Sequence, residues 1–212
     1  MNVLHVIANP RPIEKSASKQ LATSFFAKLL ETNPDVVVNN IDLYQEPPPY
    51  LSLDAYNRLN TPLLNPDYTP SKAEEHAITY AKAQAEGLRQ ADVLVLTMPM
   101  WTGGPPAIMK AWFDQVMQPG LMFNIESGVV IPLHQLSKVI LLVSSGQVYK
   151  EGDERDGITP IIRNIFSFIG VTDIEVAWAD GQSPHFFTDG ESRKQSALEM
   201  AEELAEELSE SP

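Results

Sequence analysis

The sequence predicts an α/β fold in which one parallel sheet of five strands is covered by helices on both faces. Apolar runs of strand length alternate with amphipathic segments of helical length, which is typical of consecutive βαβ units. Two of the runs, 93–96 and 139–143, are apolar at every position, as a strand buried on both faces requires. Five strands favour the doubly wound order 2-1-3-4-5 over a six-stranded arrangement.

The elements follow in strict alternation. Strands are expected in NVLHVIA (2–8), DVVVNNIDLY (35–44), DVLVLTMP (92–99), SKVILLVSS (137–145) and VTDIEVAWA (171–179). Helices are expected at 16–33, 69–92, 107–117, 157–170 (ending at Gly170) and 188–210.

Local signals mark where two of the helices begin. Ser16 or Ser18 caps the first helix, and Thr69 caps the second, with Pro70 at its first position. Segment 45–70 contains too much proline for a central strand or a long helix, so we expect a long connection that borders a site.

Length and composition indicate a single globular domain over residues 1–212, since 43% of the residues are hydrophobic and 20% are charged. The net charge of -13 opposes nucleic-acid binding, although much of it lies in the C-terminal segment 199–212. The absence of cysteine excludes disulfides and thiolate chemistry. No segment resembles a signal peptide or a bilayer span, so we expect a cytoplasmic protein that does not contact a membrane.

In open parallel sheets, ligands bind beyond the carboxyl ends of the strands where the strand order reverses. Three loops are expected there, NPRPIEKSAS (9–18), PMWTGGPP (99–106) and SSGQVYKEGDERDG (144–157). In the first, Arg11, Lys15 and the two serines precede a helix, whose free N–H groups favour an anion such as phosphate. The alternative is that the serines only cap the helix and Arg11 is a solvated charge.

The second and third loops combine small residues with hydrogen-bond donors. Trp101 offers a flat apolar surface, and Gly103 and Gly104 let a ligand approach the main chain. Ser144 to Gln147 again provide small residues and donors at a strand end. Taken alone, the second loop is more simply a turn with a hydrophobic lid, and the third is equally a plain loop with capping serines. The convergence of the three loops favours an aromatic phosphate ligand. No glycine pattern for ATP or dinucleotide phosphates is present.

Four segments carry a family resemblance over nearly the whole chain. These are NPRPIEKSAS, PMWTGGPPAIMKAWFDQVMQPGLMFN, SSGQVYKEG and FIGVTDIEVAWADG. The order and spacing of these segments resemble the FMN-dependent NADH-azoreductases and NAD(P)H:quinone oxidoreductases of the flavodoxin-like superfamily. The resemblance implies a flavodoxin-like three-layer αβα sandwich and non-covalently bound FMN.

The resemblance also assigns the cofactor contacts. Ser16, Ala17 and Ser18 are implied to hold the FMN phosphate, with Arg11 nearby. Along the ribityl chain and ring it implies Pro99, Met100, Trp101, Thr102 and Gly103, and at the other ring edge Ser144, Ser145, Gly146 and Gln147. Two departures affect the pocket, because Thr102–Gly103 replaces the usual Asn-Phe and Ser-Ser-Gly-Gln replaces Ser-Arg-Gly-Gly.

A bound flavin carries the redox chemistry, so no catalytic side chain or metal is required. We expect NADH or NADPH to pass hydride to flavin N5 and then to be replaced by a quinone or azo compound, in ping-pong order. Trp101 and Tyr149 are pocket candidates, with His185 a weaker one. His5 is expected to be a packed strand residue, and the four histidines lack metal-site spacing.

Two alternatives are an FMN-binding electron carrier and an NADPH-dependent FMN reductase that uses flavin as substrate. The long connection 45–70 favours the reductase, because a small carrier needs no additional pocket wall. The resemblance further implies a homodimer, for which Trp112, Leu121 and Phe123 are candidate interface residues, although Trp112 is equally a core residue.

Overall fold

The computed structural model describes residues 1–149 and 152–210. Its main sheet has five parallel strands in the order β2-β1-β3-β6-β7. The strands are β1 (Asn2–Ile7), β2 (Val37–Asp42), β3 (Val93–Pro99), β6 (Lys138–Ser144) and β7 (Asp173–Ala179). Counted within this sheet alone, the order is the predicted 2-1-3-4-5, so the predicted fold is confirmed.

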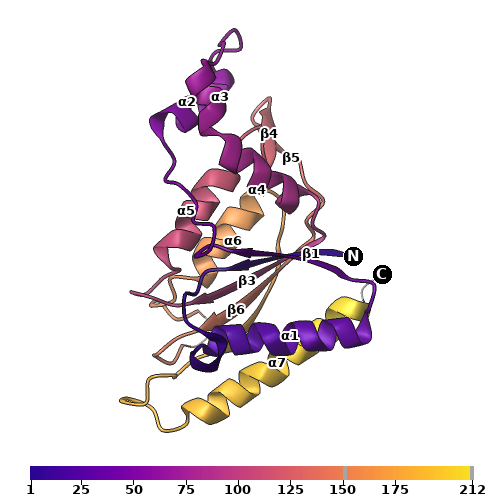
Figure 1. Ribbon diagram of the computed structural model, residues 1–212, viewed down its shortest axis with the longest axis vertical. Coiled ribbons are helices and arrows are strands. Elements are labelled where there is room, and N and C mark those ends of the chain that lie inside the picture. The colour runs from indigo at the N-terminus through magenta and orange to yellow at the C-terminus, as the bar shows by residue number, and fades with distance from the viewer. Residues whose placement is uncertain (150–151, 211–212) are drawn as a thin grey trace.

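Helices cover both faces of the sheet (Figure 1). On one face α1 (Ala17–Thr32) and α7 (Gly190–Glu210) lie side by side. The other face carries α4 (Thr79–Arg89), α5 (Ala107–Val116) and α6 (Thr159–Phe168). Each helical layer packs its own cluster of buried apolar side chains against the sheet. Strands β3 and β6, which are buried except for Lys138, separate the two clusters, as the apolar runs 93–96 and 139–143 require.

The proline-rich connection after β2 contains a helix of 12 residues, an element that the sequence analysis did not predict. Helix α2 (Leu53–Leu64) begins after the prolines, and the Ser52 side chain accepts a hydrogen bond from the Ala55 N–H at its start. Pro62 lies in the last turn of the helix, so its missing N–H removes one hydrogen bond close to the C-terminal end.

The predicted helix over 69–92 is divided in two. The first part is α3 (Lys72–Ala77), and Ile78 interrupts the helical backbone before α4 begins. Ser71, and not Thr69, caps α3, because Ser71 and Glu74 form a reciprocal capping box. The Ser-x-x-Glu spacing was visible in the sequence and is more specific than the Thr-Pro pair.

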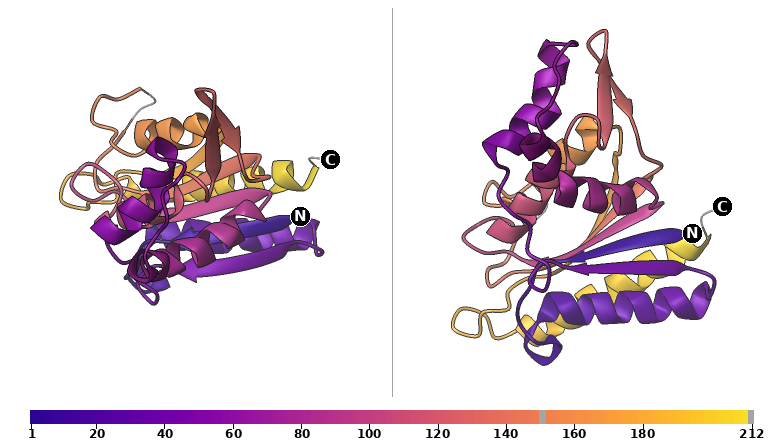
Figure 2. Two further views of the ribbon diagram at one scale, coloured as in Figure 1. Left: turned by 90° about the horizontal axis from the view of Figure 1, so that it is seen from above. Right: turned by 45° about the horizontal axis from the view of Figure 1, so that its top comes forward.

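An antiparallel hairpin that the sequence reading did not predict joins α5 to β6. It consists of β4 (Phe123–Glu126) and β5 (Val129–Pro132), with Ser127 and Gly128 at its turn. Together with α2 and α3 the hairpin stands at the end of the molecule away from α1 and α7 (Figure 1 and the right view of Figure 2). No helix in the described part of the chain is long and apolar enough to span a bilayer.

The three residues considered for a dimer interface lie inside the chain. Trp112 is fully buried in the core between the sheet and the outer helices, and Leu121 and Phe123 are almost fully buried. Because none of them presents a free surface, they are not interface residues. Trp112 is a core residue, which was the alternative considered for it.

Candidate functional site

The loop after β1 places three buried polar side chains together at the start of α1. Asn9 Nδ2 lies 2.7 Å from Ser16 Oγ and 3.1 Å from Ser18 Oγ, and it donates to both. Ser16 Oγ also accepts a hydrogen bond from the Lys19 N–H, so the predicted cap is Ser16. Arg11 is exposed beside this cluster.

The first turn of α1 retains free donors. Among the described residues, the backbone N–H groups of Ala17 and Ser18 have no hydrogen-bond partner. The 16-residue helix directs the positive end of its dipole to the same point. Unpaired N–H groups, two hydroxyls and small side chains together fit a phosphate group, which is the fit that an FMN phosphate would require.

The corner after β3 is a tight turn. Trp101 and Gly104 exchange backbone hydrogen bonds of 2.9 and 3.1 Å, and Thr102 and Gly103 between them have φ values of +52° and +78°. Trp101 is 40% exposed, which is unusual for a side chain of this size. The backbone N–H groups of Thr102 and Gly103 have no partner among the described residues. The turn therefore offers a flat apolar ring next to unpaired donors.

The loop after β6 is held from behind by the end of β7. Ser145 Oγ donates to the Gln147 carbonyl at 2.8 Å and accepts from Trp178 Nε1 at 2.8 Å. The Gln147 carbonyl also accepts from the Gly181 N–H. Ser144 and Ser145 are buried by this arrangement, whereas Gly146 and Gln147 are exposed. These hydrogen bonds therefore hold the exposed part of the loop in place from behind.

Backbone contacts bring the three loops to one edge of the sheet. The Ala8 N–H donates to the Thr97 carbonyl, which ties the first loop to β3. The Met100 N–H donates to the Ser144 carbonyl at 2.7 Å, which ties the second loop to the third. Pro99 and Met100 are buried beneath this contact. The predicted convergence at the β1/β3 switch point is therefore present in the structure.

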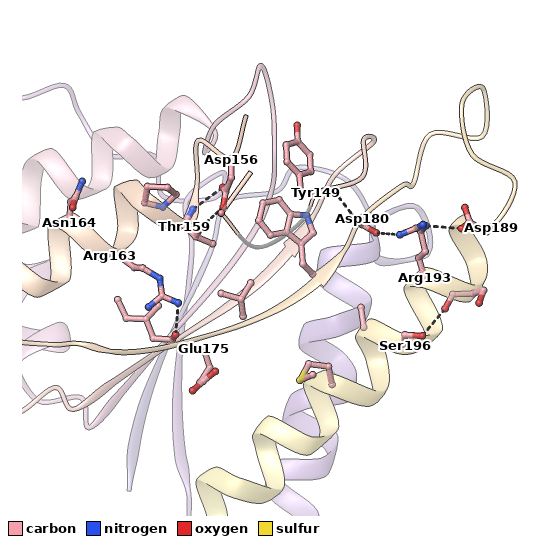
Figure 3. Close-up of a pocket in the computed structure, with 18 residues that line it drawn as sticks. Tyr149, Asp156, Thr159, Arg163, Asn164, Glu175, Asp180, Asp189, Arg193 and Ser196 are labelled. Carbon is pink, nitrogen blue, oxygen red and sulfur yellow. Dashed lines mark hydrogen bonds and ion pairs between the residues drawn. The ribbon is translucent and has the colours of Figure 1, made fainter. Parts of the chain in front are cut away.

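Tyr149 lies further out along the same edge. Its ring stacks on Trp178 with centroids 5.2 Å apart, and its N–H donates to Asp180 Oδ2. The pair stands at the end of a groove of about 1200 Å³ that runs along β7 between α6 and α7 (Figure 3). Arg193 of α7 forms ion pairs with Asp180 and Asp189 at one end of this groove (Figure 3). Tyr149 thus lines the β7 groove.

Below the first loop, His5 forms a buried polar link between neighbouring strands. Its Nδ1 lies 2.9 Å from Asn40 Oδ1, and its Nε2 lies 2.8 Å from Thr97 Oγ1. Burial lowers the pKa of His5 to about 4, against the weaker raising effects of Asn40 and Asp42. His5 is a neutral packed strand residue, as expected.

Three residues at this site were missed by the sequence reading. Asn9 was detectable as a polar residue directly after the first buried strand, at the edge where ligands bind. Trp178 and Asp180 carried no signal, because only the packing of the last strand brings them behind the third loop. In the described ranges, no cluster of three metal-ligating side chains is present.

The fold is that of a flavodoxin-like α/β protein, and its switch point brings together the start of α1, the Trp101 turn and the 144–147 loop. The chain belongs to the flavodoxin-like fold family, whose model matches residues 1–208. A relative from Beijerinckia indica, named FMN-dependent NADH:quinone oxidoreductase, is 30% identical and aligns over 92% of this chain and 96% of its own. Another from Rhizobium etli, named FMN-dependent NADH:quinone oxidoreductase 2, is 34% identical over 85% of this chain and 86% of its own.

A solved structure supports the same family. The azoreductase from Bacillus anthracis superposes with a TM-score of 0.86 at 27% identity, over 97% of this chain and 99% of the other. The predicted resemblance to azoreductases and quinone oxidoreductases is confirmed, and with it the enzyme class.

Proposed function

We propose that this chain is an FMN-dependent NAD(P)H oxidoreductase that reduces quinones, azo compounds or both. The observation that carries the proposal is the convergence of an anion site at α1 with the Trp101 turn and the supported 144–147 loop. The names of the relatives favour NADH as donor and a quinone as acceptor.

Each of the three loops would contact a different part of the cofactor. Ser16, Ala17 and Ser18 would hold the phosphate through hydroxyl and N–H donors, with Arg11 near its charge. The turn at Pro99, Met100, Trp101, Thr102 and Gly103 would run beside the ribityl chain and one ring edge. Ser144, Ser145, Gly146 and Gln147 would lie at the other edge, fixed there by Trp178.

The bound FMN would supply the redox chemistry, with hydride acceptance at N5 from the nicotinamide and subsequent reduction of the acceptor. The protein contributes position and polarity. Backbone N–H groups of residues 102 and 103 would stabilise negative charge at a ring edge of the cofactor, because they are fixed before the reaction begins. The exposed Trp101 ring would add an apolar surface beside the flavin face, where NAD(P)H and then the acceptor would bind in turn, as ping-pong order requires.

The test is the visible absorption spectrum of the purified protein, with FMN added if none is retained, before and after anaerobic NADH. Flavin bands that bleach with NADH and return with a quinone would support the proposal. Bleaching that neither a quinone nor an azo compound reverses would favour the electron carrier. Absence of flavin binding after reconstitution would contradict the proposal that this chain is an FMN-dependent enzyme. Loss of flavin on simple gel filtration would favour the alternative in which FMN is a substrate.

The proposal includes a homodimer in the cytoplasm, where NADH is available. Apolar side chains that the fold leaves exposed on α2 and the β4–β5 hairpin support self-association. They include Leu53 (73% exposed), Leu64 (88% exposed), Tyr56 and Val129. Light scattering at micromolar concentration tests it, and a monomer would contradict it.

A further inference from the structure

Asn9 is a buried polar residue of the loop 9–18, which leads into α1. It is 1% exposed, and both ends of its amide are used. Its Oδ1 accepts from the Arg11 N–H at 3.0 Å, and its Nδ2 donates to the two serine hydroxyls. Because the Arg11 N–H can only donate, the amide is fixed with its NH₂ group toward Ser16 and Ser18.

This orientation determines where the serine hydroxyl hydrogens go. Ser16 Oγ accepts from both Lys19 N and Asn9 Nδ2, so both of its lone pairs are used. Ser18 Oγ accepts from Asn9 Nδ2 and lies 3.4 Å from Ser16 Oγ. Whether or not one serine donates across that distance, at least one hydroxyl hydrogen has no acceptor among the described residues. A buried donor without an acceptor costs free energy unless a ligand accepts from it.

We infer that Asn9 is a positioning residue, which turns the hydroxyls of Ser16 and Ser18 into donors for the phosphate of the cofactor. This inference rests on the proposed function. Together with the N–H groups of Ala17 and Ser18, the hydroxyls form a site composed of donors. Such a site selects a fully ionised phosphate monoester and discriminates against a flavin that lacks phosphate, because the donors then stay unpaired.

The experiment compares the dissociation constants of FMN and riboflavin, measured by quenching of flavin fluorescence, in the wild type and in Asn9→Ala and Asn9→Asp. The ratio of the two constants isolates the phosphate contribution. We expect Asn9→Ala to reduce the preference for FMN about 10-fold, because the hydroxyls are no longer held as donors. Asn9→Asp should reduce it about 100-fold, because its carboxylate accepts the hydroxyl hydrogens and repels the phosphate.

Two further experiments separate positioning from charge and test the route of the effect. Asn39→Asp adds the same charge at an exposed position of β2 and should leave the ratio unchanged. Ser16→Ala, alone and combined with Asn9→Ala, tests the route of the effect. If Asn9 acts through Ser16, the double variant loses clearly less than the product of the two single effects. Fully multiplicative effects would overturn the inference.

The outcomes distinguish the two proposals. A wild type that binds neither flavin contradicts the proposed function itself. A wild type that prefers FMN, with an unchanged ratio in Asn9→Ala, overturns the role of Asn9 and leaves the proposed function intact. A purely structural role of Asn9 would weaken FMN and riboflavin binding equally, so that result also overturns the inference.

Discussion

Gly157 packs against the carbonyl oxygen of Gly103 so closely that a Cβ atom on Gly157 would lie 2.0 Å from that oxygen. The segment before α6 therefore supports the Trp101–Gly104 turn from behind, through main-chain contact alone. The turn is therefore held by Gly157, which lies more than 50 positions away from it in the sequence.

Gly157→Ala is expected to displace this turn. Because the obstructing atom belongs to the backbone, relief requires movement of the turn, and such overpacking costs about 1–3 kcal/mol. We predict a lower free energy of unfolding and a weaker FMN affinity, measured by urea denaturation and fluorescence titration. Gly87→Ala is the control, since a Cβ there meets nothing within 4 Å and a helical Gly→Ala change stabilises. Unchanged FMN affinity in Gly157→Ala would contradict the prediction.

Thr102 has a left-handed backbone conformation that a β-branched residue rarely adopts. Its φ of +52° matches that of Ser127 in the β4–β5 turn, and a glycine follows each of them. Since this conformation costs about 1–2 kcal/mol for L-residues other than Asn, Asp and Gly, we predict that Thr102→Asn stabilises the fold by about 1 kcal/mol. Ser127→Asn should also stabilise, and only Thr102→Asn should alter flavin binding. A thermal melt of Thr102→Asn at or below the wild-type midpoint would refute this explanation.

His5 should make the fold sensitive to acid. Its pKa falls from 6.5 to about 4 in the folded state through burial, so between these values the unfolded chain binds more protons. The free energy of unfolding therefore decreases as the pH falls through this window, by up to about 3 kcal/mol. Urea unfolding at pH 7 and pH 4.5 should show a smaller difference in His5→Gln than in the wild type. Equal differences in the two proteins would count against His5 as the cause.

Trp178→Phe removes the hydrogen bond to Ser145 and keeps an aromatic ring beneath Tyr149. One lost hydrogen bond costs about 1 kcal/mol, which lowers the melting temperature by about 2–4 °C in a domain of this size. We also predict faster FMN dissociation, because the 144–147 loop loses its support. Trp112→Phe removes a comparable bond, from α5 to Gln84 of α4, that does not involve the 144–147 loop, and it should destabilise without that effect. Equal FMN dissociation rates in the two variants would disprove the role of Trp178.

The sequence alone determined the sheet and the position of the site. Uninterrupted apolar runs at 93–96 and 139–143 require a buried parallel sheet, and the connectivity of such a sheet places the loops after β1, β3 and β6 at one edge. Ser16 was identified as a possible cap because a helix begins directly after it. These are local or topological properties, which the residue pattern specifies directly.

Only the tertiary structure decided how the site is supported. The contact of Gly157 with Gly103, the bond from Trp178 to Ser145 and the placement of Tyr149 against β7 all join segments that are distant in sequence. The residues in these contacts follow no regular spacing in the sequence. They come together only because the sheet brings their segments side by side. Segment 45–70 shows the same limit, because its proline content argued against a helix that Ser52 and the packing of Ala55 and Leu59 nevertheless stabilise.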